Sequence, residues 1–99
     1  MTSKRKLAAI MFADSVGYSA MMQENETRAK QLRDKNRRVI EEQVAVHSGE
    51  IIQYYGDGAL IIFPSAKQSL TAAIVIQQIL QQEPTVPVRI GVHLSLIHI

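Results

Sequence analysis

The tripeptide Gly56-Asp57-Gly58 constrains the fold of this chain more than any other feature. It separates two short runs rich in Ile, Tyr and Phe, Glu50–Tyr55 and Ala59–Phe63, whose composition is typical of β-strands. An Asp-Gly pair between two such runs is a strong signal for a tight β-hairpin. The sequence therefore predicts an antiparallel strand pair with Asp57 at its turn.

Two more runs have the character of strands. Lys6–Ala13 is mostly apolar and ends at an acidic residue, Asp14, which is typical of a buried strand. Val88–Leu94 is a run of the same kind near the end of the chain. After the first of these strands, Gly17 precedes a short helical piece that we predict at Ser19–Met22.

A long helix is predicted before the hairpin, because apolar residues recur there every three or four positions. It runs from a cap at Asn25 or Thr27 to about His47, and Gly49 provides its stop signal. The pattern skips one turn at Asn36. The residues predicted to face inward are Ala29, Leu32, Val39, Ile40 and Val44.

A second long helix is predicted after the hairpin. Ser65 is its expected cap, and Pro84 and Pro87 prevent it from continuing further. Its predicted inward stripe consists of Ala66, Leu70, Ala73, Ile74 and Leu80.

The predicted elements follow the order β-α-β-β-α-β, which is the order of the ferredoxin-like unit. The fold class is therefore α+β, with two helices packed on one face of a four-stranded antiparallel sheet. Right-handed crossovers put the strands in the spatial order 4-1-3-2. In that order the end of the first strand lies beside the hairpin turn, so topology brings Asp14 and Asp57 together although 43 positions separate them.

Two carboxylates that meet at a strand end can hold Mg²⁺ or Mn²⁺, because hard cations prefer oxygen ligands. Two such ions can activate an attacking oxygen and stabilise a leaving one. The turn Ser15–Ser19 leads into a helix N-terminus, whose free N–H groups can take up phosphate. Taken singly, Asp14 is more simply a cap residue and Asp57 a turn residue. Their predicted meeting is what favours a metal site.

The composition is that of one small globular domain of 99 residues with a net charge of +2. The absence of cysteine excludes disulfides and thiolate metal sites and fits a cytoplasmic protein. The longest apolar run, Ala59–Pro64, is too short to span a membrane. Asp34, Glu41 and Glu42 interrupt the basic residues of the first long helix, which favours a solvated helix face over a nucleic-acid partner.

Three motifs resemble the catalytic domain of class III adenylate and guanylate cyclases. Phe12–Ser19, FADSVGYS, is similar to the family pattern F-x-D-[I/V]-x-G-[F/Y]-[S/T]. His47–Ser65, HSGEIIQYYGDGALIIFPS, is similar to G-x-x-[I/V]-K-x-x-G-D-G-x-[L/M]-x-x-F. Val88–Leu94, VRIGVHL, is similar to R-[I/M]-G-[I/V]-H. Because the motifs keep the family order and spacing, residues 7–94 are expected to form the N-terminal part of such a domain.

The resemblance implies conversion of a nucleoside triphosphate into a 3′,5′-cyclic nucleotide and pyrophosphate, in cyclic-nucleotide signalling. By the family pattern Asp14 and Asp57 bind two Mg²⁺ or Mn²⁺ ions, and the Ser15 carbonyl adds a ligand. The backbone of Val16, Gly17, Tyr18 and Ser19 would hold the triphosphate. The family site lies between two subunits, so the resemblance also implies a homodimer.

Two departures from the family pattern limit these expectations. Position 53 is Gln, where adenylate cyclases usually carry a Lys that contacts the base, so Gln53 becomes the candidate base contact. ATP is favoured over GTP, but the base stays open. Residues 1–6 are a basic lead-in, and residues 95–99 are a tail unlike the family. The family's later base-reading and transition-state residues have no counterpart here, so the chain is expected to be a fragment that is inactive alone.

Two alternatives stay open on the sequence. Another palm-type nucleotidyl-transfer enzyme, such as a diguanylate cyclase, also places acids after its first strand and at the hairpin. A catalytically silent ferredoxin-like module for dimerisation or sensing would equally account for Gln53 and for the missing family residues.

Overall fold

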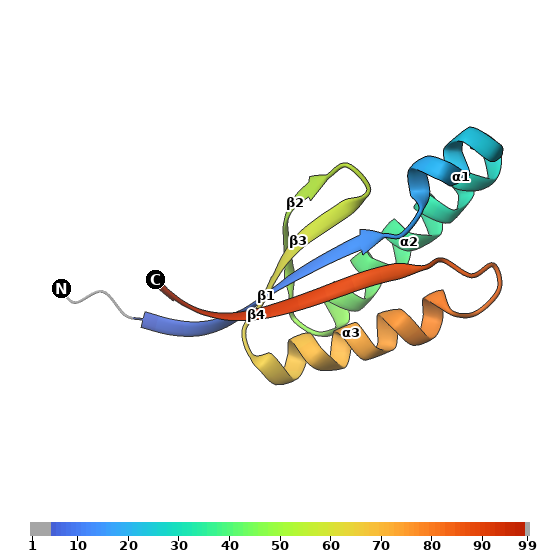
Figure 1. Ribbon diagram of the computed structural model, residues 1–99. Coiled ribbons are helices and arrows are strands. Elements are labelled where there is room, and N and C mark those ends of the chain that lie inside the picture. The colour runs from blue at the N-terminus through green and yellow to red at the C-terminus, as the bar shows by residue number, and fades with distance from the viewer. Residues whose placement is uncertain (1–4, 99) are drawn as a thin grey trace.

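The computed structural model describes residues 5–98 and shows an α+β domain, as predicted (Figure 1). A short helix, α1, precedes the first of the two long helices, so there are three helices among the described residues. The elements in chain order are β1 Arg5–Ser15, α1 Tyr18–Glu24, α2 Glu26–Val46, β2 Glu50–Tyr55, β3 Gly58–Phe63, α3 Ala66–Leu80 and β4 Val88–His98.

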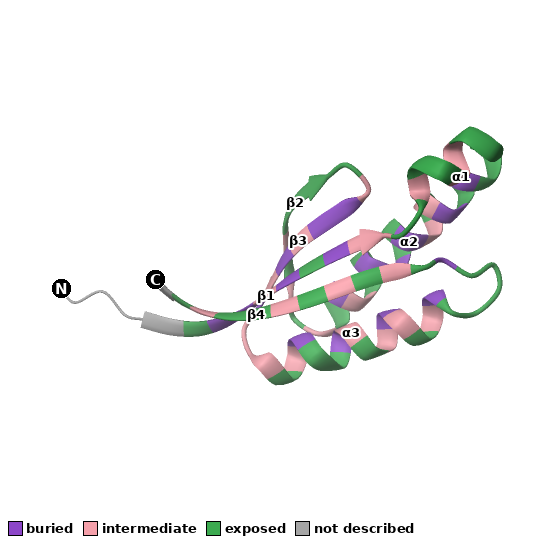
Figure 2. Ribbon diagram, viewed as in Figure 1, coloured by how far each residue is buried: buried purple, intermediate pink, exposed green. Residues whose placement is uncertain are grey.

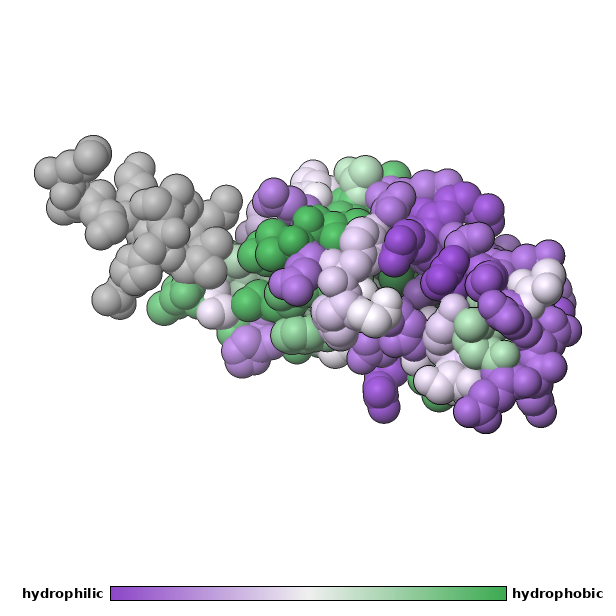
Figure 3. All heavy atoms as spheres, turned by 90° about the horizontal axis from the view of Figure 1, so that it is seen from above, coloured by the Kyte–Doolittle hydropathy of each residue, from purple (hydrophilic) through white to green (hydrophobic). Residues whose placement is uncertain are grey.

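The four strands form one antiparallel sheet in the order β2-β3-β1-β4, which confirms the predicted order 4-1-3-2. Helices α2 and α3 lie against the same face of this sheet, and α1 lies beyond the end of β1 (Figure 1). The molecule is elongated, with extents of 56 × 22 × 17 Å. On the face shown in Figure 3, hydrophobic side chains gather over one half of the described surface and hydrophilic ones over the other half.

The paired strands β1 and β4 are both longer than the sequence predicts. β1 continues two residues past Ala13, because Asp14 pairs with Arg89 and Ser15 with Val88. β4 continues past Leu94 to His98, where it pairs with the start of β1. Asp14 and Ser15 are therefore held inside a paired strand, which fixes their backbone more firmly than a loop would.

Strand alternation sets the core. In β1, Ala9, Met11 and Ala13 are fully buried against the helices, while Phe12 on the opposite face is 45% exposed. β3 is mostly buried and β2 is largely exposed (Figure 2). The helix residues that complete the core are those predicted for α2, together with Ala72, Ile76 and Leu80 of α3.

The predicted inward stripe of α3 is wrong in part. Leu80 is buried and Ala66 and Ala73 are half-buried, but Leu70 is 52% exposed and Ile74 58% exposed. The residues that α3 buries are Ser69, Ala72, Ile76 and Leu80. Apolar residues occur on more than one face of this helix, so their spacing alone could not decide which face packs against the sheet.

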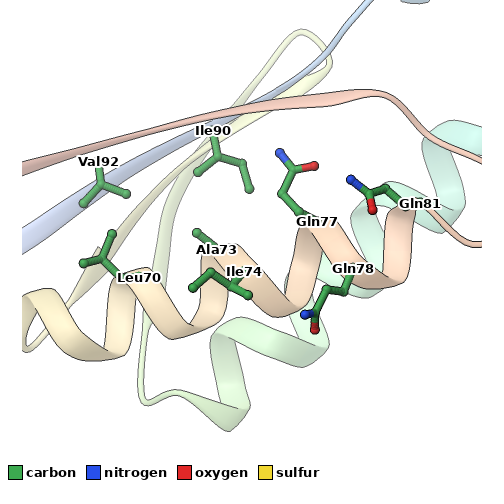
Figure 4. A pocket seen from close by; sticks show the side chains of 8 residues that line it. All are labelled: Leu70, Ala73, Ile74, Gln77, Gln78, Gln81, Ile90 and Val92. Carbon is green, nitrogen blue, oxygen red and sulfur yellow. The ribbon is translucent and has the colours of Figure 1, made fainter.

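Leu70 and Ile74 instead line an open groove between α3 and β4 (Figure 4). Ile90 and Val92 of β4 point into the same groove, whose volume is about 470 Å³. Neither aspartate of the predicted metal site lines it.

The start of α2 is settled by its cap. The Asn25 side-chain oxygen accepts a hydrogen bond from the backbone N–H of Arg28 at 3.1 Å, so Asn25 and not Thr27 is the cap. The short helix predicted at Ser19–Met22 is longer, spanning Tyr18–Glu24.

No helix among residues 5–98 combines the length and apolar character needed to cross a membrane.

Candidate functional site

Asp14 and Asp57 lie at the same end of two neighbouring central strands. Asp14 pairs with Gly58 across the β1–β3 ladder, and Asp57 is the turn residue just before Gly58. Both aspartates are half-buried. The structure thus brings together the two carboxylates that the sequence predicts as neighbours.

Gly58 leaves the space in which these groups meet. A Cβ at this position would collide with Oδ1 of Asp14 and would lie 2.8 Å from the Ala13 carbonyl oxygen. It would also lie 3.0 Å from Cε2 of Tyr55. The Asp14 carboxylate and the Tyr55 ring therefore both lie over Gly58, which only a glycine allows.

The pKa of Tyr55 reports the negative charge at this position. Burial raises the pKa of the Tyr55 phenol above its ordinary value, and the charges of Asp14 and Asp57 raise it further. Both carboxylates are therefore close enough to act on one phenol. Two carboxylates that lie near the same group provide oxygen ligands of the kind that hard cations such as Mg²⁺ prefer.

The candidate base contact Gln53 lies on the same face of the sheet as Asp14. Gln53 pairs with Leu60, and Tyr55 pairs with Gly58, which in turn pairs with Asp14. Residues paired directly across an antiparallel ladder share a face. Gln53 is exposed on this face, which the helices do not cover.

Only some backbone N–H groups of the predicted phosphate-binding segment, residues 16–19, are free to bind a ligand. The Val16 N–H donates to the Pro87 carbonyl at 3.0 Å, so this amide is not available to a phosphate. Gly17 follows with a left-handed φ of 75°, and α1 begins at Tyr18 without a side-chain cap. The first amides of a helix have no partner within the helix, so Gly17, Tyr18 and Ser19 are the amides that remain for a ligand.

The hairpin that carries Asp57 is anchored to α2 by Tyr54. Its hydroxyl donates a hydrogen bond to Oε1 of Glu41 at 2.6 Å. The guanidinium carbon of Arg37 lies 4.3 Å from the centre of the Tyr54 ring, which is a cation–π contact. Tyr54 thus faces α2 and Tyr55 faces the opposite side, so the two tyrosines have different roles.

This anchor predicts a specific pH dependence. Burial and the hydrogen bond to Glu41 raise the pKa of Tyr54 from 10 to about 12. The neutral phenol is the stabilising form, so its contribution is complete below pH 10 and is lost as the pH rises toward 12. Tyr54→Phe should destabilise the domain in urea unfolding at pH 8, and this difference should vanish or reverse at pH 12. A difference that does not change with pH would contradict the assignment.

Asn36 is a buried polar residue beside the candidate site, and the sequence pattern does not predict its contact there. It occupies a core position of α2, is only 4% exposed, and its Nδ2 donates to the Ser15 hydroxyl at 3.3 Å. The one signal in the sequence is a polar residue at the place where the apolar spacing of the helix skips a turn.

The donor set fits a hard cation only together with a ligand. Among residues 5–98 no three His, Asp or Glu side chains lie close enough to hold a metal ion by themselves. Two carboxylates and the Ser15 carbonyl are oxygen donors, which suit Mg²⁺ or Mn²⁺ held jointly with substrate phosphates.

Comparison with known proteins agrees with this geometry. The Rhizobium meliloti protein named Putative adenylate cyclase 3 is 34% identical over 100 residues, which cover 93% of this chain and 17% of that protein. The crystal structure of an adenylate/guanylate cyclase/hydrolase from Silicibacter pomeroyi is 35% identical, with a TM-score of 0.82 over 99% of this chain and 62% of that one. No protein-family model matches the chain.

Trypanosoma brucei adenylate cyclases share the fold at a TM-score of 0.85, with 12% identity over 90% of this chain and 56% of theirs. The fold is thus that of the catalytic domains of nucleotide cyclases. The chain belongs to the class III adenylate/guanylate cyclase family, as its motifs predict. It spans less than two thirds of the length of either bacterial relative.

Proposed function

We propose that this domain supplies the metal-binding part of a nucleotide cyclase, which converts a nucleoside triphosphate into a 3′,5′-cyclic nucleotide and pyrophosphate. The observation that carries the proposal is the position of the Asp14 carboxylate over Gly58, next to Asp57 at the hairpin turn. Similarity to the Silicibacter cyclase over 99% of the chain supports this chemistry over that of other palm-type enzymes.

Asp14, Asp57 and the Ser15 carbonyl would hold Mg²⁺ or Mn²⁺. Two ions bound there supply charge stabilisation to the attacking 3′-hydroxyl and to the leaving pyrophosphate. The chain's own contribution is to hold one carboxylate on a paired strand and the other at the adjoining tight turn, so that little reorganisation is needed when the ligand arrives. The tight packing over Gly58 serves this purpose.

The free amides of Gly17, Tyr18 and Ser19 would bind the triphosphate beside these carboxylates. Gln53, further along the same sheet face, would contact the base, because its amide both donates and accepts hydrogen bonds. We favour ATP over GTP because the curated relative at 34% identity is named as an adenylate cyclase. With ATP as its substrate, the domain would act in the cytoplasm.

The full protein would act as a homodimer through the uncovered sheet face. Phe12 is 45% exposed on that face, and the register puts Ile10, Leu60 and Ile62 beside it. An apolar face of this kind, bordered by the polar residues of the site, is typical of an interaction surface. A second subunit covering it would enclose the nucleotide.

Conversion of the nucleotide would need catalytic side chains in addition to Asp14 and Asp57. In the family resemblance the transition-state Asn and Arg come after the segment that this chain matches. We therefore expect the purified 99-residue chain to bind nucleotide without converting it. Formation of cyclic AMP from ATP, or of cyclic GMP from GTP, by this chain alone, measured by chromatography, would contradict that expectation.

The binding proposal is tested by titrating the chain with a nonhydrolysable ATP analogue, with and without Mn²⁺. Binding should require the metal, and the GTP analogue should bind more weakly. Equal binding in the absence of metal, or no binding at all, would instead favour a silent ferredoxin-like module.

A further inference from the structure

Asn36 is the one polar residue among the buried residues of α2. It lies near the end of β1 that carries Asp14 and near the hairpin turn that carries Asp57. On one side its Nδ2 donates to the hydroxyl of Ser15, the residue that follows Asp14. On the other side its side chain lines a small cavity with Asp57 and Gly58. One buried amide therefore contacts the strand end that follows Asp14, and it lines the same small cavity as the hairpin residues of the proposed metal site.

The packing of this amide is costly if it serves stability alone. Asn36 is 4% exposed, and its Oδ1 is buried without a hydrogen-bond partner among the described residues. A buried polar atom left in this state destabilises a fold, whereas an apolar side chain of similar size would fill the position without that cost. The apolar residues on either side along the same stripe of α2, Leu32 and Val39, show what simple core packing uses here.

The direction of the hydrogen bond explains what the amide does for the site. The Ser15 side chain points toward α2, and the strand alternation puts the Asp14 side chain on the opposite face. Pairing with Val88 sets the backbone of Ser15, and the hydrogen bond from Asn36 ties this last paired residue to α2, which resists movement of the strand end and of the Ser15 carbonyl. A residue that orients a metal-binding group in this way typically changes metal affinity by about 10- to 100-fold when it is removed.

We propose that Asn36 is a positioning residue of the acidic site, which acts through its hydrogen bond to Ser15 to set the carbonyl and carboxylate geometry for the metal. This inference rests on the proposed function, since it concerns the same site. It assigns to α2 a part in metal binding, although α2 itself supplies no metal ligand.

The experiment compares Mn²⁺ affinity with thermal stability in four variants. The dissociation constant of Mn²⁺ is measured by the EPR signal of the free ion, with a nonhydrolysable ATP analogue present, and unfolding is followed by circular dichroism. Asn36→Leu should weaken Mn²⁺ binding about tenfold with an unchanged or higher melting temperature. Ser15→Ala should weaken it similarly, and the double variant should be no weaker than either single variant.

Ser69→Ala is the matched control. Ser69 is the other buried residue whose polar side-chain atom has no partner among the described residues, and it lies in α3 near the far end of β3 from Gly58. Its replacement should leave Mn²⁺ affinity unchanged. Equal loss in this variant would assign the effect to general packing and overturn the proposal.

The remaining outcomes separate the two proposals. If the wild-type chain binds no Mn²⁺, the proposed function fails and the role of Asn36 fails with it. If the wild type binds Mn²⁺ and Asn36→Leu binds equally well, only the role of Asn36 is overturned. Additive losses in the double variant would also overturn it. If Asn36→Leu does not fold, Ser15→Ala decides alone, because unchanged affinity in that variant refutes the hydrogen bond's role.

Discussion

Replacing Asp57 with alanine is expected to abolish metal-dependent nucleotide binding while leaving the fold intact. Among residues 5–98 the site has only two carboxylates, so the substitution removes half of the negative charge that these residues give it. Within residues 5–98 the Asp57 carboxylate makes no hydrogen bond or ion pair that the fold would lose. Binding of a nonhydrolysable ATP analogue with Mn²⁺, measured by calorimetry, should fall below detection, and the circular dichroism spectrum should not change.

The Asp57→Ala variant can also be tested without a metal ion, through the pKa of Tyr55. Burial and the charge of Asp14 raise the pKa of Tyr55, and the charge of Asp57 adds to this, so the same variant should lower that pKa in part toward its ordinary value. Ultraviolet titration of the phenol measures the shift. Asp34→Ala is the control, since its carboxylate is 73% exposed on α2 and forms an ion pair at 3.5 Å with its neighbour Arg33. Loss of binding in both variants would point to a general charge effect and contradict a specific site.

The meeting of Asp14 and Asp57 could be predicted because it depends only on topology. The Gly56–Gly58 turn fixes the hairpin, and the handedness of the crossovers fixes which strand lies beside it. Neither step needs side-chain detail. The same argument gave the strand order that the structure confirms.

The features that the sequence did not predict depend on packing between elements that are far apart in the chain. The role of Asn36 depends on Ser15, and the lost Val16 amide depends on Pro87, which lies far along the chain. The face that α3 buries is decided by the sheet and α2, because Leu70 and Ile74 are as apolar as the residues that it buries. Local spacing carries no information about such partners.

Replacing Phe63 with alanine is expected to remove a large part of the stability of the domain. Phe63 is fully buried and among the largest buried side chains, and its ring packs so closely on Gly49 that a Cβ there would lie 2.6 Å from Cε1. Truncating a buried Phe costs about 3–5 kcal/mol. A domain of this size has a free energy of unfolding of only about 5–15 kcal/mol. Urea unfolding should show a midpoint far below that of the wild type.

Phe12→Ala is the matched control, because Phe12 and Phe63 are the only two phenylalanines of the chain and lie on opposite faces of the sheet. Phe12 is 45% exposed, so its truncation leaves no closed cavity and should cost about 1 kcal/mol or less. Both variants should be measured at a concentration where the chain is monomeric. Equal costs would contradict the assignment of the core face, and with it the face on which Asp14 meets the hairpin.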